Sequence, residues 1–325
     1  MSDIDKIQNS IKEEMERFEP FFRSSMQTKV PLLNIIMNYI LRRKGKQMRP
    51  MFVFLSAKMI KESVGDSTYT AASLIELLHT ATLIHDDVVD EAYERRSFFS
   101  INALWKSKIS VLVGDYLLSK GLLLAVEKNE YELLKIVSVA VREMSEGELL
   151  QIQKSRKLNI NEEIYFEIIR KKTAALIAAC AACGAKSSDA DDETVEKMRL
   201  FGEYVGIAFQ IKDDLLDYQN NGMIGKPSGN DLKEKKLTLP IIYALEKTSI
   251  VERKRIISEI KRNHKNKQKV QEIINFAIKN GGLEYTQQKM NEYRDKALII
   301  LNDFPENQSR KSLIDLVNYV VSRKK

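Results

Sequence analysis

Apolar residues recur at three- and four-residue intervals along most of this 325-residue chain, and that spacing places them on one face of an α-helix. The clearest stripe consists of Leu74, Leu77, Leu78, Ala81, Ile84 and Val88. Six prolines and thirteen glycines are too few for a many-stranded sandwich or barrel, which needs a turn about every 8–12 residues. The sequence therefore predicts an all-α protein, a large helical bundle of about ten or more helices.

Prolines and glycines divide these stripes. The prolines, which we expect where helices begin or end, are at positions 20, 31, 50, 227, 240 and 305. Residues 219–230 form the one clear loop, and Gly281-Gly282 marks a second break. We interpret residues 1–325 as a single domain, with a motif-bearing core at 45–240 and basic C-terminal helices at 241–325.

The formal net charge is +7, and the positive excess lies near the C-terminus. From Val251 to Lys325 there are 17 lysines and arginines against 9 aspartates and glutamates. These basic residues alternate with Glu, Asn and Gln on amphipathic helix rather than clustering around aromatic residues. We therefore interpret them as a solvated basic face and expect no nucleic-acid partner. Attraction to an anionic membrane surface or partner stays open.

The cysteines and the N-terminus indicate a cytoplasmic protein. Two cysteines, Cys180 and Cys183, give no disulfide framework, and their Ala-rich helical surroundings favour buried packing over a redox pair. The N-terminus is acidic and polar, with no apolar signal region. Since no uncharged apolar run reaches about 18 residues, we expect no membrane-spanning helix.

One acidic pattern occurs twice, as Asp86-Asp87-Val88-Val89-Asp90 and Asp213-Asp214-Leu215-Leu216-Asp217. On a helix the first and last aspartates of each copy lie one turn apart on the same face. Such crowded anions need a positive partner, and hard oxygen ligands suit Mg²⁺ better than Zn²⁺. Because Mg²⁺ takes one or two protein carboxylates and bridges to phosphate, two such helices facing each other predict a clamp for a polyphosphate.

Basic residues accompany both acidic copies. Lys46 and Arg49 lie at a helix start, where backbone N–H groups also favour anions. Other basic residues follow at Arg95-Arg96, Lys172, Lys226 and Lys236. Each one alone is typical of a solvated surface charge, but their association with two acidic clusters predicts an anion-binding site.

Six motifs in this order resemble those of the trans-isoprenyl diphosphate synthases, or polyprenyl synthetases. They are GKQMRP at 45–50, HTATLIHDDVVDEAYERR at 79–96, GDYLLSKG at 114–121, KTAALIAAC at 172–180, FQIKDDLLD at 209–217 and GKPSGNDLKEKKLTLP at 225–240. Among members, the chain looks most like the long-chain bacterial enzymes of the octaprenyl diphosphate synthase type that make quinone side chains. The resemblance implies the isoprenoid synthase fold, one large helical bundle around a deep central cavity, and a homodimer.

The resemblance also implies roles for individual residues. The ligands of Mg²⁺, about three ions per active site in this family, would be Asp86, Asp87, Asp90, Asp213, Asp214 and Asp217. The residues on the allylic diphosphate would be Arg95, Lys172, Lys226 and Lys236. Those on isopentenyl diphosphate would be Lys46, Arg49, His79 and Arg96. The catalytic residues at the reacting allyl centre would be Lys172, Thr173 and Gln210.

Two positions depart from the family pattern. Ser97 stands where the family usually has Gly after the arginine pair, and Glu234-Lys235-Lys236 stands where it usually has Glu-Gly-Lys. We assign the diphosphate role to Lys236 because it keeps its spacing to Thr238.

The implied reaction is head-to-tail condensation of isopentenyl diphosphate with an allylic diphosphate, farnesyl or geranylgeranyl. Ala81 and Thr82 lie about one helical turn before Asp86, where a bulky residue would close a product channel. Two small residues there favour a long product, hexaprenyl to octaprenyl, although the same residues also suit close helix packing. A peripheral membrane contact for product release stays open.

Other functions fit less well. A short-chain farnesyl or geranylgeranyl synthase and a non-catalytic subunit of a heteromeric synthase are the remaining alternatives. A non-catalytic subunit should have lost aspartates, and both clusters are intact. A phosphohydrolase with a His85-Asp86 pair needs more histidines than the three present, and a class I terpene cyclase would lack the second acidic copy.

Overall fold

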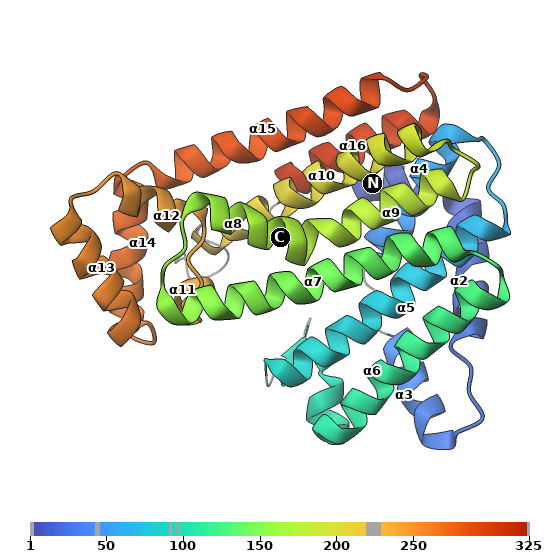
Figure 1. The fold of residues 1–325 in the computed structure, drawn as a ribbon, viewed down its shortest axis with the longest axis horizontal. Helices are drawn as coiled ribbons and strands as arrows, with labels where there is room; N and C mark the ends of the chain where they lie inside the picture. The colour runs from blue at the N-terminus through green and yellow to red at the C-terminus, as the bar shows by residue number, and fades with distance from the viewer. Residues whose placement is uncertain (1–2, 43–45, 91–92, 96–97, 219–228, 324–325) are drawn as a thin grey trace. The chain divides into compact units, whose positions relative to one another are not determined.

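The computed structural model describes residues 3–42, 46–90, 93–95, 98–218 and 229–323 (Figure 1). The helices of the first half are α1 (Asp3–Asn9), α2 (Lys12–Ser25), α3 (Pro31–Leu41), α4 (Met48–Ile60), α5 (Asp66–Val89), α6 (Ile101–Glu127) and α7 (Tyr131–Lys157). Those of the second half are α8 (Glu162–Ile169), α9 (Ala175–Lys186), α10 (Asp192–Tyr218), α11 (Asn230–Lys233), α12 (Leu239–Glu246), α13 (Ile250–Asn263), α14 (Lys267–Lys279), α15 (Gly282–Asn302) and α16 (Gln308–Ser322). The all-α prediction is confirmed.

The irregular elements are short. A π-helical turn, η1 (Arg170–Ala174), joins α8 to α9. Two antiparallel strands of two residues each, β1 (Glu94–Arg95) and β2 (Phe98–Phe99), form a small ribbon after α5. No pattern in the sequence predicted this ribbon, because two residues are too few to show alternation.

The chain forms two compact units, and each is built from separate segments. Unit 1 comprises residues 1–141, 179–199 and 304–313, and unit 2 comprises residues 142–178, 200–303 and 314–325. The interpretation of residues 1–325 as a single domain, with a motif-bearing core at 45–240, stays a prediction.

In unit 1, α5 and α6 lie side by side, with α4 packed on α5 (Figure 1). Small residues make the α5–α6 approach close: a Cβ added at Gly114 would lie 2.1 Å from the His85 ring. Ala81 is fully buried in an apolar cluster with Leu77, Val113 and Leu117. Ala81 therefore has a packing role here, which is one of the two interpretations that its small size allowed.

In unit 2, α12 packs against both α14 and α15. The Tyr243 and Tyr285 rings stack with centroids 4.1 Å apart, and the Tyr285 hydroxyl donates to the Glu162 carboxylate at 2.8 Å. At Gly282 a Cβ would lie 2.2 Å from the Pro240 carbonyl oxygen. The Gly281-Gly282 break thus allows α15 to start directly against α12.

Most prolines mark helix starts, as expected. Pro31, Pro50 and Pro240 lie in the first turns of α3, α4 and α12, where a missing N–H leaves no helical hydrogen bond unmade. Pro20 was expected at a helix boundary, and that expectation is wrong because it lies inside α2. Phe18 and Phe22, on either side of it, stack at 5.5 Å, and such packing offsets the local loss of a backbone hydrogen bond. Pro227 lies outside the described residues.

Helix α6 is the one helix in the described ranges that is long and apolar enough to cross a membrane. Length and composition alone do not make it a spanning segment, because it packs along α5 and carries Lys106, Asp115 and Lys120. Several of its large apolar side chains are nevertheless exposed, namely Leu104, Val111, Leu112, Leu122, Leu123 and Val126. The buried side of α6 belongs to the core of unit 1, and its exposed apolar row is a separate feature.

Cys180 and Cys183 are free and fully buried. Burial raises the pKa of the Cys180 thiol to about 12, although the nearby Arg49 guanidinium acts in the opposite direction. The expectation that both cysteines are packing residues agrees with this environment.

Candidate functional site

The first acidic cluster lies where α5 ends. Asp86 and Asp87 are in its last turn, and Asp90 is the C-cap residue. The Asp87 side chain is buried, Asp86 is half-buried and Asp90 is exposed. Asn102 on α6 donates to the Asp87 carbonyl oxygen at 3.3 Å, which fixes the backbone at this helix end.

Three of the basic side chains predicted to bind a diphosphate are not among those described. The Arg95 side chain and Arg96 lie outside the described residues, as does Lys226. Lys46 and Arg49 are at the start of α4, as predicted, and Gln47 between them adopts left-handed φ and ψ angles of 48° and 41°. His79 is buried on α5, one turn before Leu83.

The second acidic cluster lies in the last turns of α10, within unit 2. Asp213 Oδ1 accepts a hydrogen bond from Arg323 Nη2 at 2.6 Å. The same Nη2 donates to the Phe209 carbonyl oxygen at 3.2 Å, and the guanidinium lies 4.1 Å from the centre of the Phe209 ring. The Arg323 side chain is only 11% exposed. It is therefore a fixed cation that orients the Asp213 carboxylate.

Both carboxylate oxygens of Asp214 accept hydrogen bonds from other side chains. The Tyr165 hydroxyl donates to Oδ2 at 2.6 Å, and Gln210 Nε2 donates to Oδ1 at 2.9 Å. Gln210 Oε1 in turn accepts from Thr173 Oγ1 at 2.8 Å. The structure thus brings together Thr173 and Gln210, which the sequence predicted at one centre, and joins them through Gln210 to the second cluster.

Asp217 supports the start of α11. Its two carboxylate oxygens accept from the Asn230 and Asp231 backbone N–H groups at 3.0 and 3.1 Å. A carboxylate in this position acts as a cap for the first turn of the helix. Lys236 follows α11; its backbone N–H donates to the Asp231 carbonyl oxygen at 2.8 Å, and its Nζ lies 2.5 Å from Glu234 Oε2.

Lys172 and Thr173 lie in the π-helical turn η1, a rare element that is frequent at functional sites. Lys172 forms an ion pair with Glu148 of α7, and Lys171 forms one with Glu146 at 3.2 Å. Between these glutamates, a Cβ at Gly147 would lie 2.7 Å from the Lys172 backbone nitrogen. Gly147 thus lets α7 approach η1 closely. The glutamates on either side of it hold Lys171 and Lys172 in ion pairs.

Several carboxyl groups are buried close together around α10 and α11, and their pKa values are raised. Burial raises the pKa of Asp214 to about 7, against the opposing hydrogen bonds from Tyr165 and Gln210. Burial also raises the pKa of Asp231 to about 8, with repulsion from Asp214 and Asp217 in the same direction. The pKa of Asp213 is likewise raised by burial, while Arg323 acts to lower it. Such crowded carboxyl groups favour the binding of a cation.

The donor set of this cluster fits Mg²⁺ in chemistry and number. In the described ranges, no three His, Cys, Asp or Glu side chains converge as a ready-made metal cage. Mg²⁺ does not require one, because it uses one or two carboxylates together with water and substrate phosphate. Asp214 and Asp217 already accept hydrogen bonds on both oxygens, whereas Arg323 donates only to Oδ1 of Asp213. Asp213 is therefore the carboxylate of this copy best able to bind a metal.

Sequence reasoning missed several residues of this site: Tyr165, Glu148, Asp231 and Arg323. Tyr165 and Arg323 reach Asp214 and Asp213 across 49 and 110 positions of sequence, and no local pattern reveals such pairs. Glu146 and Glu148, separated by one glycine, and the adjacent Lys171 and Lys172 were a pattern from which ion pairs between these two segments could have been predicted.

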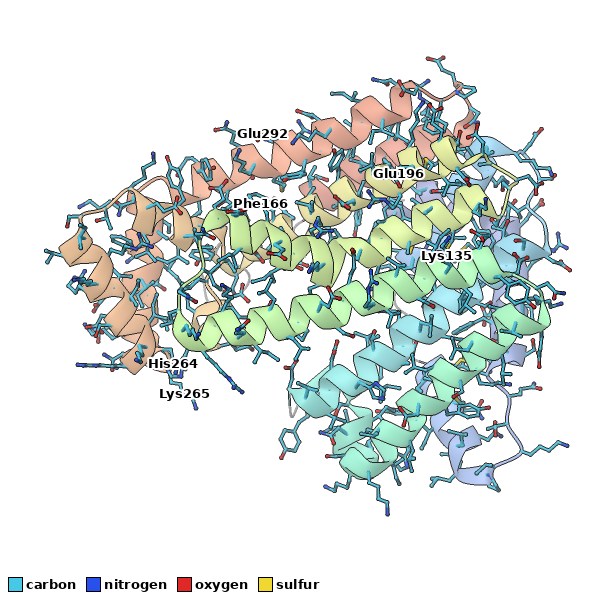
Figure 2. All side chains as sticks on the ribbon, viewed as in Figure 1. Lys135, Phe166, Glu196, His264, Lys265 and Glu292 are labelled. Atoms are coloured by element: carbon cyan, nitrogen blue, oxygen red, sulfur yellow. The ribbon has the colours of Figure 1, made fainter. Side chains whose placement is uncertain are left out.

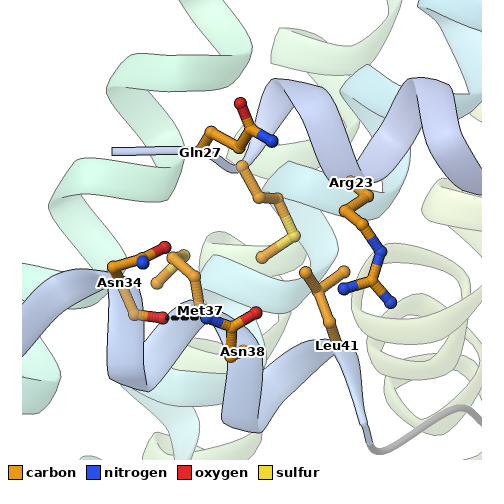
Figure 3. A pocket seen from close by; sticks show the side chains of 7 residues that line it. Arg23, Gln27, Asn34, Met37, Asn38 and Leu41 are labelled. Carbon is orange, nitrogen blue, oxygen red and sulfur yellow. Dashed lines mark hydrogen bonds between the residues drawn. The ribbon is translucent and has the colours of Figure 1, made fainter. Parts of the chain in front are cut away.

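The predicted chain-length residues lie on α5. Ala81 is in the packed cluster described above, and Thr82 is half-buried, with its hydroxyl donating to the His79 carbonyl oxygen at 2.9 Å. A separate cavity of about 230 Å³ in unit 1 lies between α2 and α3, where Asn38 Nδ2 donates to the Asn34 carbonyl oxygen at 2.9 Å (Figure 3). None of the predicted site residues lines it.

Known proteins resemble the chain over nearly its whole length. The sequence model of the polyprenyl synthetase family matches residues 30–277. Octaprenyl diphosphate synthase of Escherichia coli is 34% identical over 321 residues, which are 98% of this chain and 99% of that protein.

Solved structures are also similar to the chain over nearly its whole length. A decaprenyl diphosphate synthase from Rhodobacter capsulatus superposes with a TM-score of 0.92 at 33% identity, covering 99% of both chains. A geranylgeranyl pyrophosphate synthase from Bacteroides thetaiotaomicron superposes with a TM-score of 0.83 at 39% identity, covering 99% of this chain and 100% of that chain. With its two acidic clusters and its helical fold, the chain belongs to the polyprenyl synthetase family.

Proposed function

We propose that this protein is a trans-prenyltransferase that elongates an allylic diphosphate, farnesyl or geranylgeranyl, by repeated condensation with isopentenyl diphosphate. The product is a long-chain all-trans-polyprenyl diphosphate, hexaprenyl to octaprenyl, and we propose that it supplies quinone side chains. The octaprenyl and decaprenyl synthases among its relatives support the long chain.

The observation that carries this proposal is the hydrogen-bonded series Thr173–Gln210–Asp214–Tyr165 next to Asp213. Because Gln210 donates to Asp214 and accepts from Thr173, its amide orientation is fixed. The Thr173 hydroxyl uses its hydrogen on Gln210, so its oxygen lone pairs stay available to an electron-poor centre. This arrangement suits the stabilisation of a developing allylic cation.

Basic residues of unit 2 would bind the departing diphosphate. Lys172 in η1 and Lys236 after α11 each face a glutamate in the structure, Glu148 and Glu234. We propose that each exchanges that ion pair for the allylic diphosphate, and that Arg95 and Lys226 contribute to the same diphosphate.

Each acidic cluster would bind Mg²⁺, Asp213 with Asp214 and Asp217 in unit 2, and Asp86, Asp87 and Asp90 in unit 1. Bound Mg²⁺ supplies Lewis-acid charge that stabilises the departing diphosphate. We propose that Lys46, Arg49, His79 and Arg96 hold the diphosphate of isopentenyl diphosphate, whose double bond attacks the cation. That attack forms the new carbon–carbon bond and leaves a cation on the isopentenyl unit. A proton from the carbon next to this cation then passes to the released diphosphate, and its C–H electrons form the double bond of the product.

The direct test is turnover of the purified chain with Mg²⁺, labelled isopentenyl diphosphate and either geranyl, farnesyl or geranylgeranyl diphosphate. Dephosphorylated products are then separated by length. We expect a ladder that ends at about six to eight isoprene units. As a matched pair, Asp213→Asn should abolish the ladder and Asp192→Asn, at the exposed start of α10, should keep it.

The product length is the finer part of the proposal. A Thr82→Phe variant should shorten the ladder, because the half-buried Thr82 side chain leaves room for a larger group. Ala81→Phe is a poorer test, since extra atoms in the packed cluster around Ala81 strain the core. A wild-type ladder that stops at three or four units would contradict the long-chain proposal and favour a short-chain synthase, the activity named for the 39% identical structure.

Assembly and location are further parts of the proposal. The exposed apolar row of α6 supports a homodimer, because apolar rows of this size are typical of protein interfaces. Sedimentation of the purified chain tests it: a monomer at micromolar concentration would contradict it. Lack of turnover by the folded chain alone would favour a subunit of a heteromeric synthase. We further propose a cytoplasmic enzyme with peripheral membrane contact, which cell fractionation tests.

A further inference from the structure

Helices α13 and α14 form a pair within unit 2, joined by a short turn (Figure 1). The inner side of α13 carries Ile256 and Ile260, both buried, and α14 contributes Val270, Ile273 and Ile274. One side of α13 thus makes all of its contacts with the apolar core, and the opposite side takes no part in that packing.

That opposite side carries cations and no carboxylate. At about 100° per residue, the positions facing away from Ile256 and Ile260 are Val251, Lys254, Ser258, Lys261, Arg262 and Lys265, the last in the turn after the helix. All of these except Ser258 are exposed. Figure 2 shows Lys265, beside His264, extending away from the ribbon at the end of α13. We call this set the outer face of α13.

The two glutamates of α13 are both engaged elsewhere. Glu252 accepts from Arg255 Nε at 2.9 Å and Nη2 at 2.6 Å, and Glu259 accepts from Asn263 Nδ2 at 2.8 Å. In the part of the chain that the structure describes, no salt bridge reaches Lys254, Lys261, Arg262 or Lys265. The positive charge of the outer face is therefore uncompensated by the protein.

The start of α13 adds two aliphatic side chains to this charge. Ile250 is 72% exposed and Val251 is 80% exposed, directly after the helix cap at Ser249. Ser249 Oγ accepts from the Glu252 backbone N–H at 3.2 Å, so the helix begins in an ordered conformation with both aliphatic side chains in water. The fold does not require these two side chains to be exposed. Their contact with water is unfavourable, and it would be removed if another apolar phase covered them.

We propose that the outer face of α13 binds reversibly to an anionic membrane surface, with Ile250 and Val251 entering the interface and the cations facing lipid headgroups. An amphipathic helix with cations beside aliphatic residues has the composition that such surfaces bind. A nucleic acid is a poorer match, because the helix has no aromatic residue on which a base could stack. The biological need rests on the proposed function, since a long prenyl chain leaves its enzyme for an apolar phase.

The test is co-sedimentation of the full chain with vesicles of phosphatidylcholine alone or mixed equally with phosphatidylglycerol. We expect binding to the mixed vesicles only, weakening as salt increases. Neutralising Lys254, Lys261, Arg262 and Lys265 to Gln should lower the partition coefficient by at least about 100-fold, at roughly fivefold for each charge. Ile250→Ser with Val251→Ser should lower it by about tenfold.

A matched control removes the same charge elsewhere. Lys128, Lys135, Arg156 and Lys157, exposed residues on and beside α7, are changed to Gln. This variant should bind within about threefold of the wild-type chain, because none of its four changed residues belongs to the outer face of α13. Unchanged thermal midpoints for all variants show that folding is intact.

Three outcomes would overturn the proposal. They are equal binding to neutral vesicles, equal loss in the control and outer-face variants, and binding of a short RNA or polyglutamate without binding of vesicles. The test is independent of catalysis: a chain that binds mixed vesicles through the outer face but makes only short products would uphold this proposal and contradict the long-chain function.

Discussion

The two acidic clusters share one spacing in sequence but differ in how the fold holds them. In the second cluster, Arg323, Tyr165 and Gln210 donate to Asp213 and Asp214, and the start of α11 is bound to Asp217. In the first cluster, Asp90 is exposed at the C-terminal end of α5, where the helix dipole disfavours an anion.

The difference indicates that one sequence pattern can carry two kinds of carboxylate. The second copy includes carboxylates that organise the protein as well as Asp213, which we propose as a metal ligand. The first copy ends in Asp90, whose negative charge at the C-terminal end of α5 does not stabilise that helix. The following predictions separate these roles by comparing substitutions in the two copies.

The largest effect should come from Asp213→Asn, which removes the charge best placed for Mg²⁺. We expect kcat to fall by about 100- to 1,000-fold, the usual effect of removing one preorganised group that stabilises transition-state charge. Asp90→Asn in the first cluster should have an effect of similar size, measured by steady-state turnover. If either variant kept wild-type turnover, that aspartate would not be a metal ligand.

Arg323→Gln should raise the Mg²⁺ concentration needed for half-maximal effect by about 10- to 100-fold, the range seen when a partner of a metal ligand is lost. The measurement is Mg²⁺ titration in the presence of inorganic diphosphate, followed by thermal midpoint as well as by turnover. Arg255→Gln is the matched control, because Arg255 also pairs with a carboxylate but on an exposed helix surface. An unchanged Mg²⁺ dependence in Arg323→Gln would show that Arg323 does not position Asp213.

Tyr165→Phe should lower the free energy of unfolding by about 1–3 kcal/mol, because it leaves a buried Asp214 oxygen without its donor. Urea unfolding at pH 8 measures it. Tyr131→Phe is the control, since that hydroxyl is on an exposed side chain and a surface change of this kind alters stability by less than about 0.5 kcal/mol. Equal effects of the two substitutions would contradict the structural role of Tyr165.

The smallest effects should have opposite signs in the two clusters. Asp217→Asn should destabilise the protein by about 1 kcal/mol, because an amide offers one acceptor oxygen to the two N–H groups of α11. Asp90→Asn should stabilise it by about 0.3–1 kcal/mol, since it removes an anion from a helix C-terminus. Urea midpoints measure both, and two shifts of the same sign would remove the distinction between the clusters.

How much the sequence could predict depends on how far apart along the chain the interacting residues lie. Helical periodicity is local, so the helices on which both clusters lie were predictable, and so was the start of α4 that carries Lys46 and Arg49. The placement of Thr173 and Gln210 at one centre was implied by the family resemblance, and the hydrogen bond between them is seen only in the structure. Arg323 was out of reach, because its role depends on α16 ending beside α10, and nothing near residue 323 indicates that.

Local rules also gave wrong or incomplete answers where packing dominates. Pro20 lies within α2, between two stacked aromatic residues, because side-chain packing outweighs one lost hydrogen bond. The small Ala81 suits either an open channel or close packing, and in the structure it is enclosed by apolar side chains from α5 and α6. A small side chain gives the same sequence signal in both situations.

The segmented construction of the two units has a consequence for biosynthesis. Unit 1 begins at the N-terminus but includes residues 304–313, where Ser312 Oγ lies 2.9 Å from Ser10 Oγ and Asn307 Nδ2 donates to the Met59 carbonyl oxygen at 3.2 Å. A ribosome makes those residues long after the first helices of unit 1. The earliest-made helices therefore stay incompletely covered until residues 304–313 have been made, and we expect the nascent chain to need chaperones for longer than a chain whose domains close in order.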